Sequence, residues 1–223
     1  MRPDGRPAGR RPVAVLATLV ATALAATVLA ACGIASDDSP RALTVSTTTT
    51  QPSATPTSGG TAAVLYYVAG KSLVPLSRSL ADRRPGTVLN ALLEPPGDAE
   101  TARGLTTSIP NGTELRGLTT DGDILEVDLS SDFENVAGPG RQQAIGQMVM
   151  TATEFPEIRR VRFRVGGKPV QVTSLTRGDT SVVTECDFAE LLPTAEQARE
   201  LDLDPAVNQR LAQRRADVER RCA

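Results

Sequence analysis

The chain of 223 residues contains no histidine and no tryptophan, and only 3% of its residues are aromatic. Without histidine it cannot build a Ser-His-Asp or Cys-His nucleophile system, or a zinc site with histidine ligands. The scarcity of aromatic rings also makes a sugar-stacking platform hard to build, which argues against a glycosidase. The sequence has neither a Gly-x-Ser-x-Gly elbow nor a glycine-rich phosphate loop with lysine. We therefore expect a protein that is not an enzyme and needs no cofactor.

An excess of positive charge is also missing. The net charge is −2, and loss of residues 1–31, which hold four arginines and one aspartate, would leave −5. Proteins that bind nucleic acids rely on a basic surface, so we expect no nucleic-acid partner.

Four aspartates in one short stretch raise the question of a calcium site. An EF-hand loop starting at Asp121 would need an oxygen ligand where Leu125 stands and a glycine where Glu126 stands. The pattern fails at both positions, and we expect no metal site. The four residues are Asp121, Asp123, Asp128 and Asp132.

The first 31 residues have the pattern of an export signal. Four arginines precede an uncharged, mostly apolar run over residues 12–31. The run ends in Leu29-Ala30-Ala31-Cys32, which resembles the lipobox of bacterial lipoproteins, in which Cys32 would carry a diacylglyceryl group. Two acyl chains hold a protein firmly on a membrane. The alternatives are a membrane-spanning helix of about 20 residues and an ordinary signal peptide cleaved near Ala31.

The remaining chain divides by composition. Residues 32–60 are rich in Thr, Ser and Pro and predict a disordered tether. About 160 residues follow, enough for one domain with a real core. We expect an α+β domain over residues 61–178 and a helical tail over residues 179–223.

The hydrophobic periodicity of residues 61–178 predicts the order ββαββαββ. The fold class that follows is α+β, a two-layer sandwich with a mainly antiparallel sheet and two helices on one face. The predicted strands are 63–68, 73–76, 115–120, 123–129, 160–165 and 170–172, and the predicted helices are 85–94 and one that begins after Gly140 and ends before Pro156.

The strand at residues 160–165 alternates apolar residues with Arg160, Arg162 and Arg164. Three arginines on one face could bind an anionic wall polymer, phospholipid headgroups or the acidic patch of a partner protein. The alternative is a solvated face whose arginines pair with Glu126 and Asp128 on neighbouring strands.

Once Cys32 is assigned to lipid, Cys186 and Cys222 remain as a pair in an oxidising compartment, which predicts a disulfide. Two free thiols are the alternative. A helix beginning at Asp204 would place Cys222 on its apolar side, facing the domain. Its charged residues are expected to face solvent: Arg210, Arg214, Arg215, Asp217, Glu219, Arg220 and Arg221.

Six stretches in this order resemble the GerMN domain of sporulation and spore-germination proteins, over about residues 62–174. The resemblance implies a membrane-tethered envelope protein without catalysis of its own, which assembles with other envelope proteins or with itself. We therefore expect a lipid-anchored scaffold on the outer face of the cell membrane, with a binding module for peptidoglycan or another wall polymer as the alternative. The stretches are Val64-Leu65-Tyr66-Tyr67-Val68, Leu92-Leu93-Glu94-Pro95-Pro96, Ser108-Ile109-Pro110-Asn111-Gly112-Thr113, Val127-Asp128-Leu129-Ser130-Ser131-Asp132-Phe133, the helix from Arg141, and Glu154-Phe155-Pro156-Glu157-Ile158 leading into Val161-Arg162-Phe163.

Overall fold

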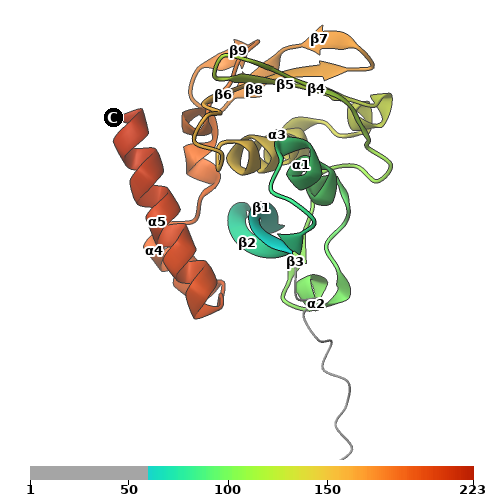
Figure 1. The fold of residues 1–223 in the computed structure, drawn as a ribbon. Coiled ribbons are helices and arrows are strands. Elements are labelled where there is room, and N and C mark those ends of the chain that lie inside the picture. Colours follow the sequence, from blue (N-terminus) through green and yellow to red (C-terminus); the bar gives the residue numbers. More distant parts are fainter. Residues whose placement is uncertain (1–59) are drawn as a thin grey trace, which may run out of the picture. The chain divides into compact units, whose positions relative to one another are not determined.

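Two main β-sheets with helices between them make up the part of the chain that the computed structural model describes, residues 60–223 (Figure 1). The predicted signal peptide at residues 1–31, the predicted lipidation site Cys32 and the predicted tether up to residue 59 lie outside the described residues. Their roles therefore stay predictions.

The first sheet is centred on β1 (Thr61–Ala69), which lies between β2 (Ser72–Leu80) and β3 (Leu105–Thr106). Residues 63–69 of β1 are all buried. A strand whose successive side chains are all buried must be covered on both faces. Helices α1 (Pro85–Leu93) and α3 (Gly138–Ala152) contact β1, and α5 (Pro205–Cys222) contacts the neighbouring β2.

Strand β3 pairs only with Val68 and Ala69 of β1. Polar side chains of α3 (Gly138–Ala152) form hydrogen bonds with the backbone of Tyr66 of β1. The hydroxyl of Thr151 accepts a hydrogen bond from the backbone N–H of Tyr66 (3.1 Å). The amide of Gln147 donates to the backbone carbonyl of Tyr66 (2.9 Å). Gln147 and Thr151 are fully buried, and these bonds meet the requirement that buried polar groups be paired.

The second sheet has the order β4-β5-β6-β7, and its β5 and β6 run parallel. The reason is that α3 connects them, and a crossover of this length returns the chain in the same direction. The inner faces of β5 and β6 bury the predicted apolar residues. The strands are β4 (Leu115–Asp121), β5 (Ile124–Leu129), β6 (Arg160–Val165) and β7 (Lys168–Val170).

The α+β sandwich class predicted from the sequence is confirmed. Helix α1 (Pro85–Leu93) contacts β1 and β4, and α3 contacts β1 and β6, so both helices lie between the sheets (Figure 1). The strands are thus divided between separate sheets where the periodicity predicted one sheet. Helix α3 also begins at Gly138, earlier than predicted, because Pro139 is tolerated in the first turn of a helix.

The C-terminal region packs into the same core as the rest of the described chain. Val183, Phe188, Leu211 and Val218 are buried in it. No helix within residues 60–223 is both long enough and apolar enough to cross a membrane. The predicted strand 170–172 is divided between β7 and β8. The remaining elements are α2 (Asp98–Thr101), η1 (Ser131–Asn135), β8 (Val172–Ser174), β9 (Gly178–Thr180), η2 (Glu185–Leu191), α4 (Ala195–Glu200) and α5 (Pro205–Cys222).

Candidate interaction surfaces

The arginines predicted as a binding face lie together on the outer face of β6. Arg162 and Arg164 both approach Glu126 of β5, at 3.3 Å and 3.8 Å. Arg160 forms an ion pair with Asp123, which precedes β5. These contacts follow from the register, which places Glu126 opposite Arg162.

Acidic groups balance the arginines on this face. Asp128 lies opposite Arg164 and accepts a hydrogen bond from the backbone N–H of Gly167 (3.0 Å). A face with comparable numbers of both signs gives an anionic polymer little long-range attraction. The geometry therefore favours the solvated, paired alternative, with Glu126 as the main partner.

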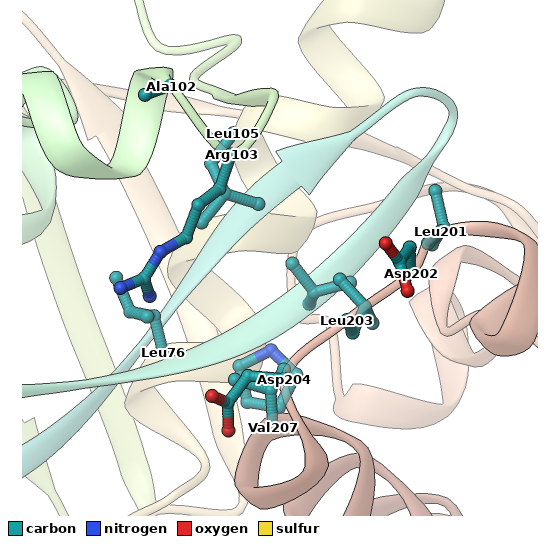
Figure 2. Close-up of a pocket in the computed structure, with 11 residues that line it drawn as sticks. Leu76, Ala102, Arg103, Leu105, Leu201, Asp202, Leu203, Asp204 and Val207 are labelled. Atoms are coloured by element: carbon teal, nitrogen blue, oxygen red, sulfur yellow. The ribbon is translucent and has the colours of Figure 1, made fainter.

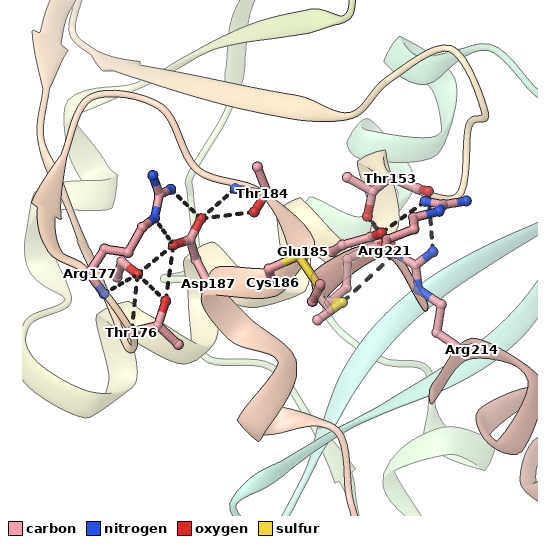
Figure 3. The surroundings of a disulfide bond; sticks show 12 residues. Thr153, Thr176, Arg177, Thr184, Glu185, Cys186, Asp187, Arg214 and Arg221 are labelled. Atoms are coloured by element: carbon pink, nitrogen blue, oxygen red, sulfur yellow. Dashed lines mark hydrogen bonds and ion pairs between the residues drawn. A yellow bond between two sulfur atoms is a disulfide. The ribbon is translucent and has the colours of Figure 1, made fainter. Parts of the chain in front are cut away.

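A disulfide joins Cys186 of η2 to Cys222 at the end of α5, with their Cα atoms 5.5 Å apart (Figure 3). The bridge spans 36 residues of sequence and connects the last turn of the tail helix to the domain. Its position agrees with the pairing predicted from the cysteine count.

Next to this disulfide lies an ion cluster that the sequence did not predict. The side chain of Arg214 is 95% buried, and its guanidinium donates to Glu185 (2.6 Å) and to the hydroxyl of Thr153 (2.5 Å). The other carboxylate oxygen of Glu185 accepts from Arg221 (2.9 Å). The expectation that Arg214 faces solvent is therefore wrong. Arg214 belongs to the buried stripe of α5, three residues after Leu211 and four before Val218.

A second carboxylate extends this cluster towards the first sheet. Glu154 accepts from the hydroxyl of Tyr66 (2.8 Å) and from Arg210 (2.7 Å). Burial, followed by the nearby charge of Glu154, raises the pKa of Tyr66 well above its usual value, so Tyr66 stays a hydrogen-bond donor. The contacts tie β1, the end of α3 and the tail helix together.

On the other side of the disulfide, Asp187 is buried and holds several segments in place (Figure 3). It accepts from Arg177 (2.7 Å), from the hydroxyl of Ser174 (2.6 Å) and from the backbone N–H of Thr184 (2.7 Å). Burial alone would raise the pKa of Asp187, but these hydrogen bonds outweigh it and hold the pKa well below its ordinary value.

A pocket of about 320 Å³ lies where the tail meets the domain (Figure 2). One wall comes from β2 and from the segment that follows α2; the other comes from the α4–α5 connection and the first turn of α5. Most of the lining is aliphatic, with Arg103 at one wall and Asp202 and Asp204 at the other. The aliphatic lining consists of Val74, Pro75, Leu76, Ala102, Leu105, Leu201, Leu203 and Val207.

These features differ in how far sequence could have found them. Arg214 has the helical spacing of the apolar residues Leu211 and Val218, and this spacing could have predicted that Arg214 is buried. A buried arginine in turn requires an acidic partner. The identity of that partner, Glu185, and the pocket depend on tertiary packing that periodicity does not reveal. Within residues 60–223 no three Asp, Glu or Cys side chains converge as metal ligands would.

Comparison with known proteins points to one family. Residues 64–171 match the family model Germane, described as sporulation and spore germination. Similar solved structures include the tandem GerMN domains of the sporulation protein GerM from Bacillus subtilis, with 17% identity, 58% of this chain covered and a TM-score of 0.46. The first GerMN domain of the same protein has 18% identity over 56% of this chain and 95% of its own, with a TM-score of 0.44. A Clostridium perfringens protein described as a candidate lipoprotein has 21% identity over 58% of this chain and 90% of its own, with a TM-score of 0.39.

The chain covers 48% of the tandem GerM structure, about half of its length. No curated protein matches it. The family match coincides with the segment that carries the predicted strands and helices, and it ends at Gln171, before the disulfide-linked tail. Residues 64–171, just under half of the chain, therefore match the GerMN family, and this segment is called the GerMN domain below.

Proposed function

We propose that this protein is a non-enzymatic module, anchored by lipid on Cys32 to the outer face of the cell membrane, that assembles with other envelope proteins. The observation that carries the proposal is the GerMN match at residues 64–171, placed after an export-type segment that ends in Leu29-Ala30-Ala31-Cys32. The match supports an assembly role outside the cytoplasm by analogy, since a fold alone does not determine function.

The arrangement of buried charges supports a structural role over a catalytic one. Glu154, Glu185 and Asp187 each bond to arginines and to groups on other elements. Glu154 does line a surface pocket, but its carboxylate oxygens already accept from Tyr66 and Arg210. Here the carboxylates hold the tail and the β8–β9 hairpin on the domain, which suits a module that presents a fixed surface.

In-cell photo-crosslinking tests the assembly proposal. A photoreactive residue replaces Arg162 on the exposed face of β6 in one variant and Gln209 on the exposed side of α5 in another, both in the full chain. We expect adducts to a defined envelope protein or to a second copy, identified by mass spectrometry. Adducts only to wall fragments would contradict the assembly role and favour the wall-binding alternative.

The anchor is tested separately with Cys32→Ala. If Cys32 carries lipid, the variant leaves the membrane fraction or accumulates as an unprocessed precursor, while Cys186→Ala with Cys222→Ala stays membrane-bound. A mature Cys32→Ala protein that remains in the membrane would refute the lipid anchor. This control matters because it separates the cysteine predicted to be lipidated from the two that form the disulfide.

A wall-binding module remains the second candidate because Arg160, Arg162 and Arg164 share one face. Sedimentation with purified wall material distinguishes the two roles. Our proposal predicts that the protein stays in the supernatant, and that Arg162→Ala with Arg164→Ala changes nothing. Sedimentation that these substitutions abolish would establish the arginine face as a wall-binding site.

A further inference from the structure

We propose that the open edge of β2 binds an extended segment of a partner protein, which pairs with Ser77 and Ser79 and places an aliphatic side chain in the neighbouring pocket. Within residues 60–223, β2 pairs with β1 alone, so its other edge carries no strand. An open edge with unpaired backbone groups is a template for pairing with another chain.

The backbone of Tyr66 determines which groups of β2 point outward. Its N–H donates to Thr151 and its carbonyl accepts from Gln147, so both groups face α3 and not β2. Pro75 lies opposite Tyr66 in the antiparallel pair. When the backbone of one residue of such a pair faces away from the partner strand, so does that of the other. Pro75 agrees with this direction, because proline is tolerated in an edge strand where its missing N–H would face outward.

Ser77 and Ser79 repeat the direction of Pro75, since the backbone orientation alternates along a strand. Their N–H and carbonyl groups therefore point towards the open edge, and both residues are exposed. In the described part of the chain, neither serine makes a backbone hydrogen bond outside the β1–β2 pair. Together they offer two donors and two acceptors, repeated about 7 Å apart, a pattern that an extended chain matches.

The pocket of about 320 Å³ lies next to these serines along β2. Leu76, which precedes Ser77, lines the pocket and stays partly exposed. A residue opposite Leu76 on an added antiparallel strand carries its side chain to the same face of the sheet. That side chain therefore extends over the pocket, and an aliphatic group there covers Leu76, Leu201 and Leu203 (Figure 2).

The charges around the pocket determine the rest of the segment's chemistry. Asp202 and Asp204 are exposed at one wall, and neither forms an ion pair within residues 60–223 (Figure 2). A basic residue after the aliphatic one would lie near these carboxylates, and complementary charges of this kind give specificity. The partner segment is thus extended, with an aliphatic residue followed by arginine or lysine.

A second copy of the chain is a poorer occupant in either register. Centred on Ser77, it places its own Arg78 over the pocket, but Glu100 already binds that guanidinium (2.9 Å). Centred on Arg78, it places Leu80 there, and the next charged residue is Asp82, which the aspartates of the pocket repel.

The edge of β4 is also less suited to pairing. Its pairing with β5 is interrupted by a bulge between Leu115 and Gly117. Bulges twist an edge strand and protect it from further pairing. The straight pairing of β2 with β1 continues without such a shift from Ser72 to Leu80.

This inference rests on the proposed assembly role, because it names the kind of segment by which an envelope partner is held. The two can fail separately. A partner that crosslinks in cells but does not contact β2 would leave the assembly role standing and refute the β2 site.

The test adds the capped peptide Thr-Val-Thr-Ile-Arg to the isotopically labelled full chain and follows the backbone amides of Ser77 and Ser79 by NMR. We expect both amides to shift and to exchange more slowly with solvent, because they become covered by the added strand. N-methylation of the peptide at its second threonine removes the donor to Ser77 and should weaken binding about tenfold. Glutamate in place of the arginine should weaken it several-fold.

Two variants test the same contact from the side of the protein. Ser77→Pro removes the outward N–H without taking a hydrogen bond from β1, and should lower the affinity about tenfold. Ser77→Ala keeps this N–H and should bind as the wild type does. If Ser77→Pro does not fold, the N-methylated peptide carries the test.

Three results would overturn the proposal. The first is the absence of any shift of the two amides at millimolar peptide. The second is equal affinity for the plain and the N-methylated peptides. The third is self-association of the chain that Ser77→Pro abolishes, which would assign the edge of β2 to a second copy.

Discussion

Arginine–carboxylate pairs occur on two parts of this molecule, at very different depths. On the outer face of β6, Arg162 and Glu126 keep 36% and 28% of their side-chain surface exposed. Where the tail meets the domain, Arg214 and Glu185 each keep 5%. Exposed pairs gain little because water screens both charges, whereas loss of one buried partner leaves a charge without solvation. The chemistry is the same, but only the buried pairs can determine how the protein folds.

Removal of Arg214 should have the largest effect. Arg214→Ala leaves Glu185 buried with one partner fewer, and we expect a loss of about 3–5 kcal/mol in the free energy of unfolding. Urea denaturation followed by circular dichroism measures it. Arg215→Ala on the same helix is the control and should cost less than about 0.5 kcal/mol. A loss below about 1 kcal/mol for Arg214→Ala would mean that the buried pair is not essential.

Removal of the disulfide should cause the second-largest loss in the free energy of unfolding. Cys186→Ser with Cys222→Ser opens a loop of 36 residues, and the chain-entropy model gives a loss of about 3–4 kcal/mol. Reduction of the wild-type protein should lower the unfolding free energy by a similar amount. Reduction should leave the double variant unchanged, which serves as the control.

An intermediate case is Asp187, which is 1% exposed, while its partner Arg177 is 54% exposed. Asp187→Asn keeps the shape but removes the charge that donors from Ser174, Arg177 and Thr184 share, and we expect a loss of about 1–3 kcal/mol.

The same residue predicts an acid dependence. Because the folded-state pKa of Asp187 is depressed, its contribution is present above its unfolded pKa of about 3.9 and is lost as the pH falls through the folded pKa. Unfolding free energies of wild type and Asp187→Asn should therefore converge as the pH falls below about 4. A constant difference from pH 6 to pH 2 would contradict the assignment.

The smallest effect is expected on the exposed face. Arg162→Ala should change the unfolding free energy by less than about 1 kcal/mol, and the change should shrink further in 1 M salt. A larger, salt-resistant loss would mean that this face is more structured than its exposure indicates.

The accuracy of the predictions from sequence differs from one element to another. Strand β6 was predicted with its bounds because one face is buried and the other is wet, which produces a clear alternation. Its parallel pairing with β5 was missed, since the direction of pairing depends on the connection and not on the strand itself. The disulfide was found because the cysteine count left a single pair.

The buried polar contacts between the tail and the domain were the hardest to predict. In a helix rich in charged residues, the sequence predicts Arg214 to lie on the surface. Only the folded structure places Glu185 and Thr153 within hydrogen-bond distance of it. Gln147 and Thr151 are likewise polar residues on the buried side of α3. Their role is clear only from the structure, in which they bond to the backbone of Tyr66 in β1. Polar residues that serve partners distant in sequence leave no periodic pattern.

We predict that the GerMN domain and the tail unfold as one cooperative unit. Native-state hydrogen exchange tests it most directly by comparing the slowest amides of α3 and α5 in the oxidised protein. We predict the same opening free energy for both helices, equal to that of global unfolding. Amides of α5 that open at a free energy several kcal/mol lower, while α3 stays protected, would show the tail to be a separate attachment and contradict this account.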